Sequence, residues 1–376
     1  TGVSIEKIEK AAHIFGMSQR SVVMFARGVE QQSKGVDNVA LYTSMALLRG
    51  QVGKFASGVA TFTGQGNGQG GREHGQKSDL LPGYRKLTDP EAVKYISSVW
   101  GIDPEDMPKP GVSAYEMFDE IQRDNIRAMH VICSNPAVSA PNAEYIWAGF
   151  KKLDFLVVSD FFLSETAEFA DVVLPATTWA EDEGTTTNIE GRVIHIRKVR
   201  EPLGESKPDW EILCRIAERM GKGKHFPYQT PAEIFEEFRI ATKGGKADYY
   251  GITWDRIDKE DGVFWPCPSE DHPGTPTMFK EKFATENGKA NLAAVDWKEP
   301  GEYPSEDYPH ILTTGRVVFH YLSGNQTRRV DFLMEQCSVP YAEMHPELAS
   351  QYNLSNGDKV KLTTRRSNMT VEVKLT

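Results

Sequence analysis

The sequence predicts an α/β protein with doubly wound, mostly parallel sheets, followed by a β-rich segment. Over residues 1–220, short apolar runs with strand character alternate with amphipathic helical segments, which is typical of parallel sheets covered by helices. From residue 303 onward, apolar runs joined by turns replace this alternation and indicate the opening of a β-barrel. The expected domains are therefore 1–65, 66–220, an irregular connection at 221–302, and a barrel segment at 303–376.

Each element is predicted from the spacing of apolar side chains and from turn-forming residues. Apolar positions recur at helical spacing after Ser4, whose hydroxyl is suited to an N-cap. Glycines crowd residues 50–75 so densely that an extended loop is expected there. Helices are expected at 4–15, 36–48, 114–123, 142–151, 209–219 and 345–352, and strands at 21–26, 128–133, 154–159, 172–174, 310–314, 359–363 and 370–374, the last two paired across a turn.

The composition argues against several classes of protein. The 376 residues are 39% hydrophobic and 26% charged, which is ordinary globular composition. Acidic side chains outnumber basic ones by 53 to 43, so the formal charge of −10 disfavours nucleic acid as a partner. No apolar stretch approaches the length of about 20 residues that spans a membrane, so a soluble protein is expected. The cysteines are too widely spaced for a zinc or iron–sulfur site, and no metal ligands are expected among Cys133, Cys214, Cys267 and Cys337.

Asp160 follows the predicted strand at 154–159. A carboxylate just beyond a parallel strand lies where such sheets bind ligands, and it can accept hydrogen bonds from ribose hydroxyls or a guanine edge. From spacing alone, a role in capping the following turn explains Asp160 about equally well. Asn135 similarly follows the strand at 128–133, in a polar loop that can present amides to a phosphate or that simply ends the strand.

Two glycine-bearing segments are less specific as signals of ligand binding. The run from Phe62 to Gly71 is too irregular for a phosphate-binding loop or a dinucleotide-binding turn. The turn from Thr314 to Arg316 carries donors suited to phosphate or pterin heteroatoms. A salt bridge explains Arg316 at least as well.

Eight short motifs, taken in order, distinguish the chain from a generic α/β protein. They are T-G-Q at 63–65, S-N-P at 134–136, V-V-S-D at 157–160, E-T-A-x-x-A-D-V-V-L-P at 165–175, E-G-T-x-T-N-x-E-G-R at 183–192, K-P-D-W at 207–210, W-P-C-P at 265–268 and T-T-G-R-V-x-x-H-Y at 313–321. This order resembles the prokaryotic molybdopterin oxidoreductases, which include nitrate reductases and formate dehydrogenases. The resemblance covers nearly the whole chain.

The resemblance implies a fold and a cofactor. Members of this family place two guanine dinucleotides between two α/β domains and a C-terminal double-psi β-barrel, so a bis-molybdopterin guanine dinucleotide with molybdenum is expected. Residues 1–65 and 66–220 would belong to the two α/β domains, and 303–376 to the first part of the barrel. Asp182 stands where some relatives carry a cofactor-binding lysine, so no contact is assigned to it. The positions that match the family's cofactor contacts are Gln65, Asn135, Ser139, Ser159, Asp160, Asp209, Thr314, Gly315, Arg316, His320, Tyr321 and Ser323.

The residues expected to act in catalysis are Thr63 and Gln65. Formate dehydrogenases of the family are similar in carrying an arginine two residues before the matched glutamine, and Thr63 occupies that position here. The local sequence instead resembles nitrate reductases of the assimilatory and periplasmic group. The implied reaction is reduction of nitrate to nitrite by oxygen-atom transfer, with electrons from a donor protein or reductase subunit, in the cytoplasm. A formate dehydrogenase and a non-catalytic scaffold relative are the alternatives, and the choice between molybdenum and tungsten stays open.

Two features of the family have no counterpart in these residues. They are the N-terminal cysteine cluster that holds a [4Fe-4S] centre and the residue that ligates molybdenum. The chain is therefore expected to be an internal and C-terminal fragment that is inactive alone, with the iron–sulfur cluster in the missing N-terminal part.

Overall fold

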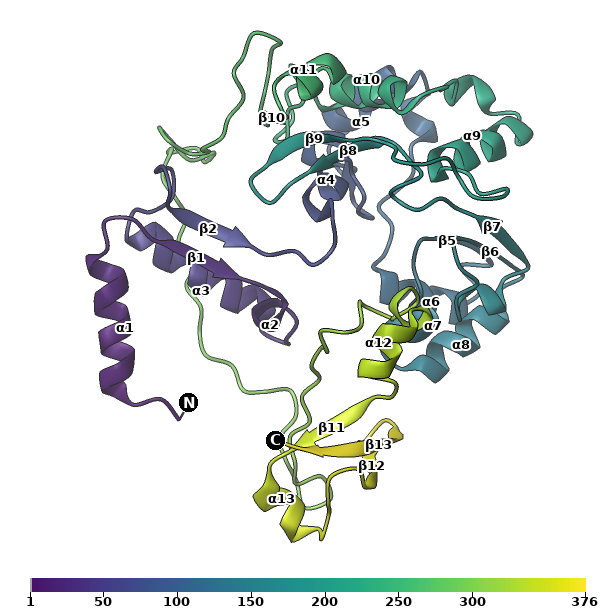
Figure 1. Cartoon of the computed structure of the whole chain (residues 1–376). Coiled ribbons are helices and arrows are strands. Elements are labelled where there is room, and N and C mark those ends of the chain that lie inside the picture. Colours follow the sequence, from purple (N-terminus) through teal and green to yellow (C-terminus); the bar gives the residue numbers. More distant parts are fainter. Residues whose placement is uncertain (1) are drawn as a thin grey trace. The chain divides into compact units, whose positions relative to one another are not determined.

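The computed structural model describes residues 2–376 (Figure 1). The chain divides into two compact units. Unit 1 comprises 1–111, 183–197 and 222–301, and unit 2 comprises 112–182, 198–221 and 302–376. Both units are discontinuous in sequence, whereas the domains expected from the sequence are contiguous. Those domain boundaries stay a prediction.

The parallel sheet of unit 2 confirms the predicted α/β class. Strands β5 (Ala128–Ile132), β6 (Phe155–Asp160) and β7 (Val172–Pro175) are all parallel and lie in the order β5-β6-β7. Helices α6 (Ala114–Gln122) and α8 (Ala143–Lys152) pack together through Phe118 and Phe150, whose rings meet edge-on at 5.2 Å. Because all three strands run the same way, the residues that follow them gather at one edge of the sheet.

The next segment of unit 2 returns to that edge. Thr177 N–H donates to the Lys207 carbonyl (3.1 Å), and Lys207 N–H donates to the Pro175 carbonyl (3.1 Å). This pairing brings the start of α9 (Asp209–Arg219) beside the end of β7. The helix has the residues that the sequence predicts.

The C-terminal part of unit 2 contains a three-stranded sheet in the order β11-β13-β12. Strand β12 (Lys359–Thr363) pairs antiparallel with β13 (Asn368–Leu375), as predicted, and β11 (Tyr341–Met344) adds a parallel strand. The expected strand at 310–314 is wrong, because these residues are exposed and pair with no strand among those described. The other helices of this part are η5 (Thr327–Arg329), α12 (Asp331–Gln336) and α13 (Pro346–Gln351).

In unit 1, the glycine-rich segment contains more regular structure than the sequence predicts. Strand β2 (Gly58–Thr61) pairs in parallel with β1 (Val22–Phe25), and α4 (Gly68–Glu73) follows it. The expectation of one extended loop over 50–75 was therefore wrong, since backbone pairing and a buried Glu73 stabilise elements that glycine disfavours. The N-terminal helices are α1 (Ile5–Met17), capped by Ser4 as expected, α2 (Arg27–Glu30) and α3 (Gly35–Leu48).

The expected irregular connection at 221–302 is only partly irregular. Helices α10 (Pro231–Thr242) and α11 (Trp254–Lys259) enclose an aromatic core around Tyr249, and β10 (Val263–Phe264) joins a sheet in the order β10-β9-β8. The residues of this aromatic core come from scattered positions in the sequence, so they show little periodicity. Strand β10 pairs with β9 (Arg192–Ile196), which also pairs with β8 (Gly184–Thr187). The remaining elements of unit 1 are β3 (Leu80–Leu81), β4 (Arg85–Lys86), α5 (Pro90–Trp100), and the short helices η1 (Pro82–Tyr84), η2 (Pro104–Asp106) and η4 (Gly223–His225).

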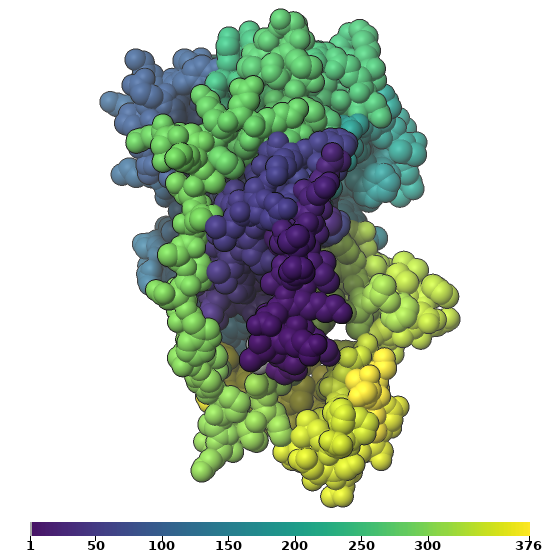
Figure 2. All heavy atoms as spheres, turned by 90° about the vertical axis from the view of Figure 1, so that its left-hand side faces the viewer, coloured from purple at the N-terminus to yellow at the C-terminus, as the bar shows by residue number. Residues whose placement is uncertain are grey.

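Residues 277–301 form the last part of unit 1, contain neither helix nor strand, and run along the rest of that unit (Figure 2). Trp297 lies 4.9 Å from the Lys34 ammonium, and Lys298 pairs with Asp37 at 3.1 Å. These contacts place the segment beside α3. Across residues 2–376, no helix combines the length and apolar character needed to cross a membrane.

Candidate functional site

Polar side chains gather where β5 and β6 end, in what we call the strand-end site (Cys133, Asn135, Ser159, Asp160 and Asp209). Asp160 is the last residue of β6 and is only 5% exposed. Its Oδ1 accepts a hydrogen bond from Phe161 N–H (2.8 Å), so the capping role considered for it from the sequence exists. Burial raises the pKa of Asp160, although hydrogen bonds from the following turn and the Arg329 charge oppose this effect.

Asp209, at the first position of α9, faces Cys133 from the loop after β5. Its Oδ2 accepts the Cys133 thiol hydrogen at 3.3 Å, while Oδ1 is buried without a hydrogen-bond partner in the part of the chain described. Burial raises the pKa of Asp209, and the negative charge of Asp160 adds to this rise. Burial together with the Asp209 charge raises the pKa of Cys133 to about 12, so the thiol is a neutral donor. The adjoining Trp210 indole N–H is likewise buried without a partner among residues 2–376.

Ser159 is buried on β6 and bonds to the neighbouring strand. His130 Nε2 and Ser159 Oγ are 2.8 Å apart and share a hydrogen bond. Burial lowers the pKa of His130, against the opposing charge of Asp209, which favours the neutral imidazole.

Asn135 ties the loop after β5 to the loop after β6. Its Oδ1 accepts hydrogen bonds from Thr166 N–H (3.1 Å) and Thr166 Oγ1 (2.8 Å), and its Nδ2 donates to Glu165 Oε2 (2.8 Å). Ser139 Oγ donates to the Asn135 carbonyl at 3.0 Å. The structure thus uses both residues to hold the loops, and their contact with a ligand stays a prediction.

Two arginines that the sequence reasoning missed lie at the same loops. Arg328 Nη2 donates to Glu165 Oε1 at 2.6 Å. Arg329 Nη2 donates to the Leu163 carbonyl at 3.1 Å, and its guanidinium lies 4.5 Å from the Phe162 ring centroid. The adjacent arginines at 328 and 329, seven residues beyond the T-T-G-R-V-x-x-H-Y motif, were the available signal, but nothing in the sequence connects them to residues 162–165.

The predicted contacts at 314–323 fall into two groups. His320 and Tyr321 are bonded to the segment that carries the arginines, because His320 Nδ1 lies 3.1 Å from Thr327 Oγ1 and Tyr321 N–H donates to the same oxygen at 3.2 Å. His320 Nε2 also lies 2.6 Å from the Cys337 carbonyl. The other predicted contacts are the exposed Thr314, Gly315 and Arg316 and the half-buried Ser323, and all six stay predictions as ligand contacts.

Thr63 and Gln65 belong to unit 1, on the loop between β2 and α4. Thr63 Oγ1 donates to Gln69 Oε1 at 3.4 Å, and Gln65 is exposed. The end of this loop is anchored, since Asn67 Oδ1 accepts Thr187 N–H at 2.9 Å.

A buried network follows in α4. Glu73 is fully buried and accepts hydrogen bonds from Thr187 Oγ1 (2.8 Å) and Tyr249 Oη. Burial raises the pKa of Glu73, although these bonds oppose the rise. The next residue, His74, is also buried, and burial lowers its pKa to about 4.

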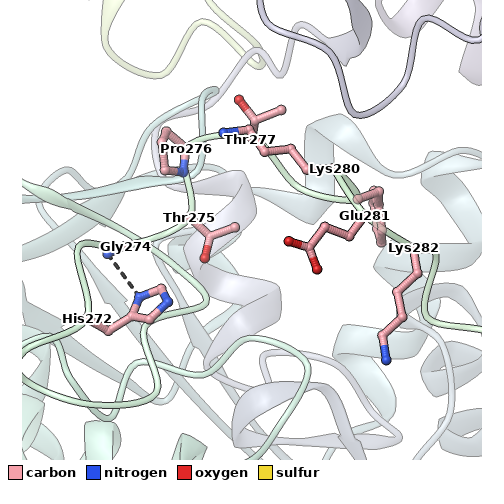
Figure 3. Close-up of a pocket in the computed structure, with 9 residues that line it drawn as sticks. His272, Gly274, Thr275, Pro276, Thr277, Lys280, Glu281 and Lys282 are labelled. Carbon is pink, nitrogen blue, oxygen red and sulfur yellow. Dashed lines mark hydrogen bonds between the residues drawn. The ribbon is translucent and has the colours of Figure 1, made fainter.

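A separate pocket in unit 1, with a volume of about 470 Å³, contains none of the predicted site residues (Figure 3). Figure 3 shows the Glu281 carboxylate directed toward Thr275, while the Lys282 side chain points away. Within residues 2–376, no three His, Cys, Asp or Glu side chains are grouped so that they could hold a metal ion.

The comparisons with known proteins cover the whole chain. The family model "Molybdopterin oxidoreductase" matches residues 3–219, and the model "Molydopterin dinucleotide binding domain" matches residues 311–376. The assimilatory nitrate reductase catalytic subunit of Bacillus subtilis (strain 168) is 46% identical over 100% of this chain and 53% of that protein. The F420-dependent formate dehydrogenase subunit alpha of Methanocaldococcus jannaschii is 41% identical over 100% of this chain and 54% of that protein. The chain spans about half the length of these curated relatives.

A solved structure supports the fold alone. Acetylene hydratase from Pelobacter acetylenicus aligns with a TM-score of 0.59 and 18% sequence identity, over 100% of this chain and 55% of that chain. The likeness agrees with the α/β class and the parallel sheets described above.

Proposed function

This chain belongs to the molybdopterin oxidoreductase family, and from that premise we propose that its strand-end site holds the guanine end of a molybdopterin guanine dinucleotide. We further propose that the full-length protein reduces nitrate to nitrite. The family match supports an oxidoreductase with a molybdopterin cofactor, and the choice of nucleotide and substrate rests on the residues below.

The observation that supports the guanine end is the unpaired Asp209 Oδ1. A buried acceptor without a partner costs about 1–3 kcal/mol, and a guanine edge offers N–H donors that would remove this cost. Asp160 also ends a parallel strand, and Asp209 begins α9 beside the end of β7, at the edge where α/β sheets bind nucleotides. The donor and acceptor chemistry of the site therefore fits a guanine nucleotide.

In the proposed reaction, the bound molybdenum cofactor supplies the oxygen-atom transfer from nitrate. The chain's own residues bind the cofactor and orient the substrate. Asn135 and Glu165 hold the two strand-end loops together, and the buried bonds of Asn67 and Glu73 fix α4 behind the loop that carries Thr63 and Gln65. We propose that Gln65 contacts the pterin and that Thr63 lies beside the substrate.

Thr63 supports nitrate over formate as the substrate. A guanidinium provides a bidentate fork that suits the formate carboxylate, whereas threonine offers one hydroxyl and no charge. A metal carried by the bound cofactor would itself supply an attachment point for nitrate, so a site without this arginine would lose less with nitrate than with formate. Formate oxidation is the second candidate, because the formate dehydrogenase relative is 41% identical to this chain.

The test is to assay the full-length enzyme with nitrate and with formate, using viologen dyes as electron carriers. We expect nitrate turnover with negligible formate oxidation. Thr63→Arg should lower the KM for formate, while the matched control Thr63→Ser, which keeps the hydroxyl, should leave the substrate preference unchanged. Formate turnover above nitrate turnover in the wild-type enzyme would refute the assignment to nitrate.

We propose a second guanine dinucleotide, a [4Fe-4S] cluster held by residues outside this sequence, an electron-donor protein or reductase subunit as partner, and a cytoplasmic location. Molybdenum, iron and guanine analysis of the purified full-length protein tests the first two points together.

A further inference from the structure

Arg329 is the feature of the strand-end site that the proposed guanine contact leaves unexplained. The groups that gather there are mainly acidic, with Asp160, Asp209 and Glu165 around the loops. A guanine dinucleotide also carries a diphosphate, and carboxylates repel its negative charge. A site that holds such a ligand therefore needs a cation that carboxylates have not already neutralised.

The two arginines of η5 differ in this respect. Arg328 is paired with Glu165 at 2.6 Å, so its charge is balanced within the protein. Arg329 instead donates to neutral carbonyls, from Nη2 to Leu163 (3.1 Å) and from Nε to Asn325 (3.0 Å). In the described part of the chain it forms no ion pair, and its Nη1 donates no hydrogen bond.

Arg329 is held in place before any ligand binds. Its guanidinium packs at 4.5 Å from the centroid of Phe162, two residues beyond Asp160. Its charge also acts on the Asp160 carboxyl, opposing the effect of burial on the pKa of that group. The unpaired cation of η5 is thus held against the loop that follows Asp160, which lowers the entropic cost of binding an anion.

The neighbouring backbone fits this arrangement. Gly324 has a φ of +75°, and a Cβ at this position would lie 2.9 Å from Arg328 Nε. A larger residue would strain the turn and displace Arg328 from Glu165. Because Glu165 also accepts the Asn135 amide, Arg328 connects the η5 segment to both strand-end loops.

We propose that Arg329 binds the diphosphate of the guanine nucleotide, and that Arg328 is a positioning residue that acts through Glu165. This inference rests on the proposed function of the strand-end site. A guanidinium with free donors matches phosphate oxygens in geometry and charge.

The experiment measures binding of guanosine and of GDP to the full-length protein prepared without cofactor, by isothermal titration calorimetry. Wild-type protein should bind GDP more tightly than guanosine, and this advantage should shrink as salt rises. Arg329→Gln should weaken GDP binding about ten- to a hundredfold and leave guanosine binding unchanged, as expected for one charge-assisted contact. Arg329→Lys should retain part of the advantage, which separates lost charge from lost folding.

The matched control is Arg365→Gln, since Arg365 is an exposed arginine whose ion pair with Glu302 lies elsewhere in unit 2. Its binding of both probes should equal that of the wild type. Equal affinities for guanosine and GDP in the wild type, or an unchanged GDP advantage in Arg329→Gln, would overturn the role of Arg329 while leaving the guanine contact intact. Failure of both probes to bind any variant would overturn the proposed function of the site, and this inference with it.

Discussion

Replacing Glu73 tests whether the buried network behind the Thr63 loop depends on a neutral carboxyl. Glu73 is fully buried and has no ion pair among residues 2–376, while Thr187 and Tyr249 both donate hydrogen bonds to its Oε2. Its other oxygen is buried without a partner in that range. Burial raises its pKa above the ordinary value of 4.5, which is also the value expected in the unfolded chain.

Replacing Glu73 by alanine and replacing it by glutamine differ in which buried groups lose their hydrogen-bond partners. Glu73→Ala removes the acceptor of both hydroxyls, and each buried group left unsatisfied costs about 1–3 kcal/mol, or about 2–6 kcal/mol in all. Glu73→Gln keeps a carbonyl acceptor in nearly the same volume. Its cost at acid pH should therefore stay below about 1.5 kcal/mol.

The pH dependence gives the sharper test. Because the folded-state pKa of Glu73 is raised, its contribution to stability is fully present below 4.5 and is lost as pH rises through the folded pKa. Glutamine does not titrate. Between pH 4.5 and the folded-state pKa, the free energy of unfolding of Glu73→Gln should therefore rise relative to that of the wild type by about 1.4 kcal/mol per pH unit. Above the folded pKa, the difference should become constant.

The assay is urea unfolding at several pH values from 4 to 8, followed by tryptophan fluorescence and circular dichroism. The control is Glu347→Gln, whose side chain is 88% exposed, and it should follow the wild-type curve at every pH. A difference between Glu73→Gln and the wild type that does not change with pH would refute the argument, as would a cost for Glu73→Ala below 1 kcal/mol.

Two further predictions concern the strand-end site. Asp160→Ala should lower the guanine and molybdenum content of the purified full-length enzyme, since one charge-assisted bond costs about 1.5–3 kcal/mol when lost, and unchanged content would assign Asp160 to turn capping alone. Because burial and the Asp209 charge raise the pKa of Cys133 to about 12, this thiol should resist iodoacetamide at pH 8, and Asp209→Asn should speed its alkylation as measured by mass spectrometry. Rapid alkylation of wild-type Cys133 would contradict the proposed environment.

The sequence determined those elements whose apolar side chains repeat at a regular spacing. The helix at 209–219 and the pairing of β12 with β13 agree with prediction, because their periodicity is local and their turns carry recognisable residues. The same reasoning missed α10, since the aromatic residues around Tyr249 pack through contacts between distant segments. It also predicted a strand at 310–314, where apolar residues lie without a pairing partner in the described chain.

The sequence also placed part of the candidate site. Once β5 and β6 are parallel, the residues that follow them must meet at one edge of the sheet, so the nearness of Asn135 and Asp160 follows from the predicted topology. The family resemblance was likewise carried by ordered motifs, and the family models confirm it.

Only the tertiary structure decided which charges are balanced and which are not. Arg328 and Glu165 are 163 residues apart in sequence, and Glu73 and Tyr249 are 176 apart, so no local pattern predicts either contact. The pKa of a carboxyl and the availability of a guanidinium depend on burial and on the groups packed against them. These properties arise from the folded neighbourhood, and for that reason Arg329 and Glu73 became visible only in the structure.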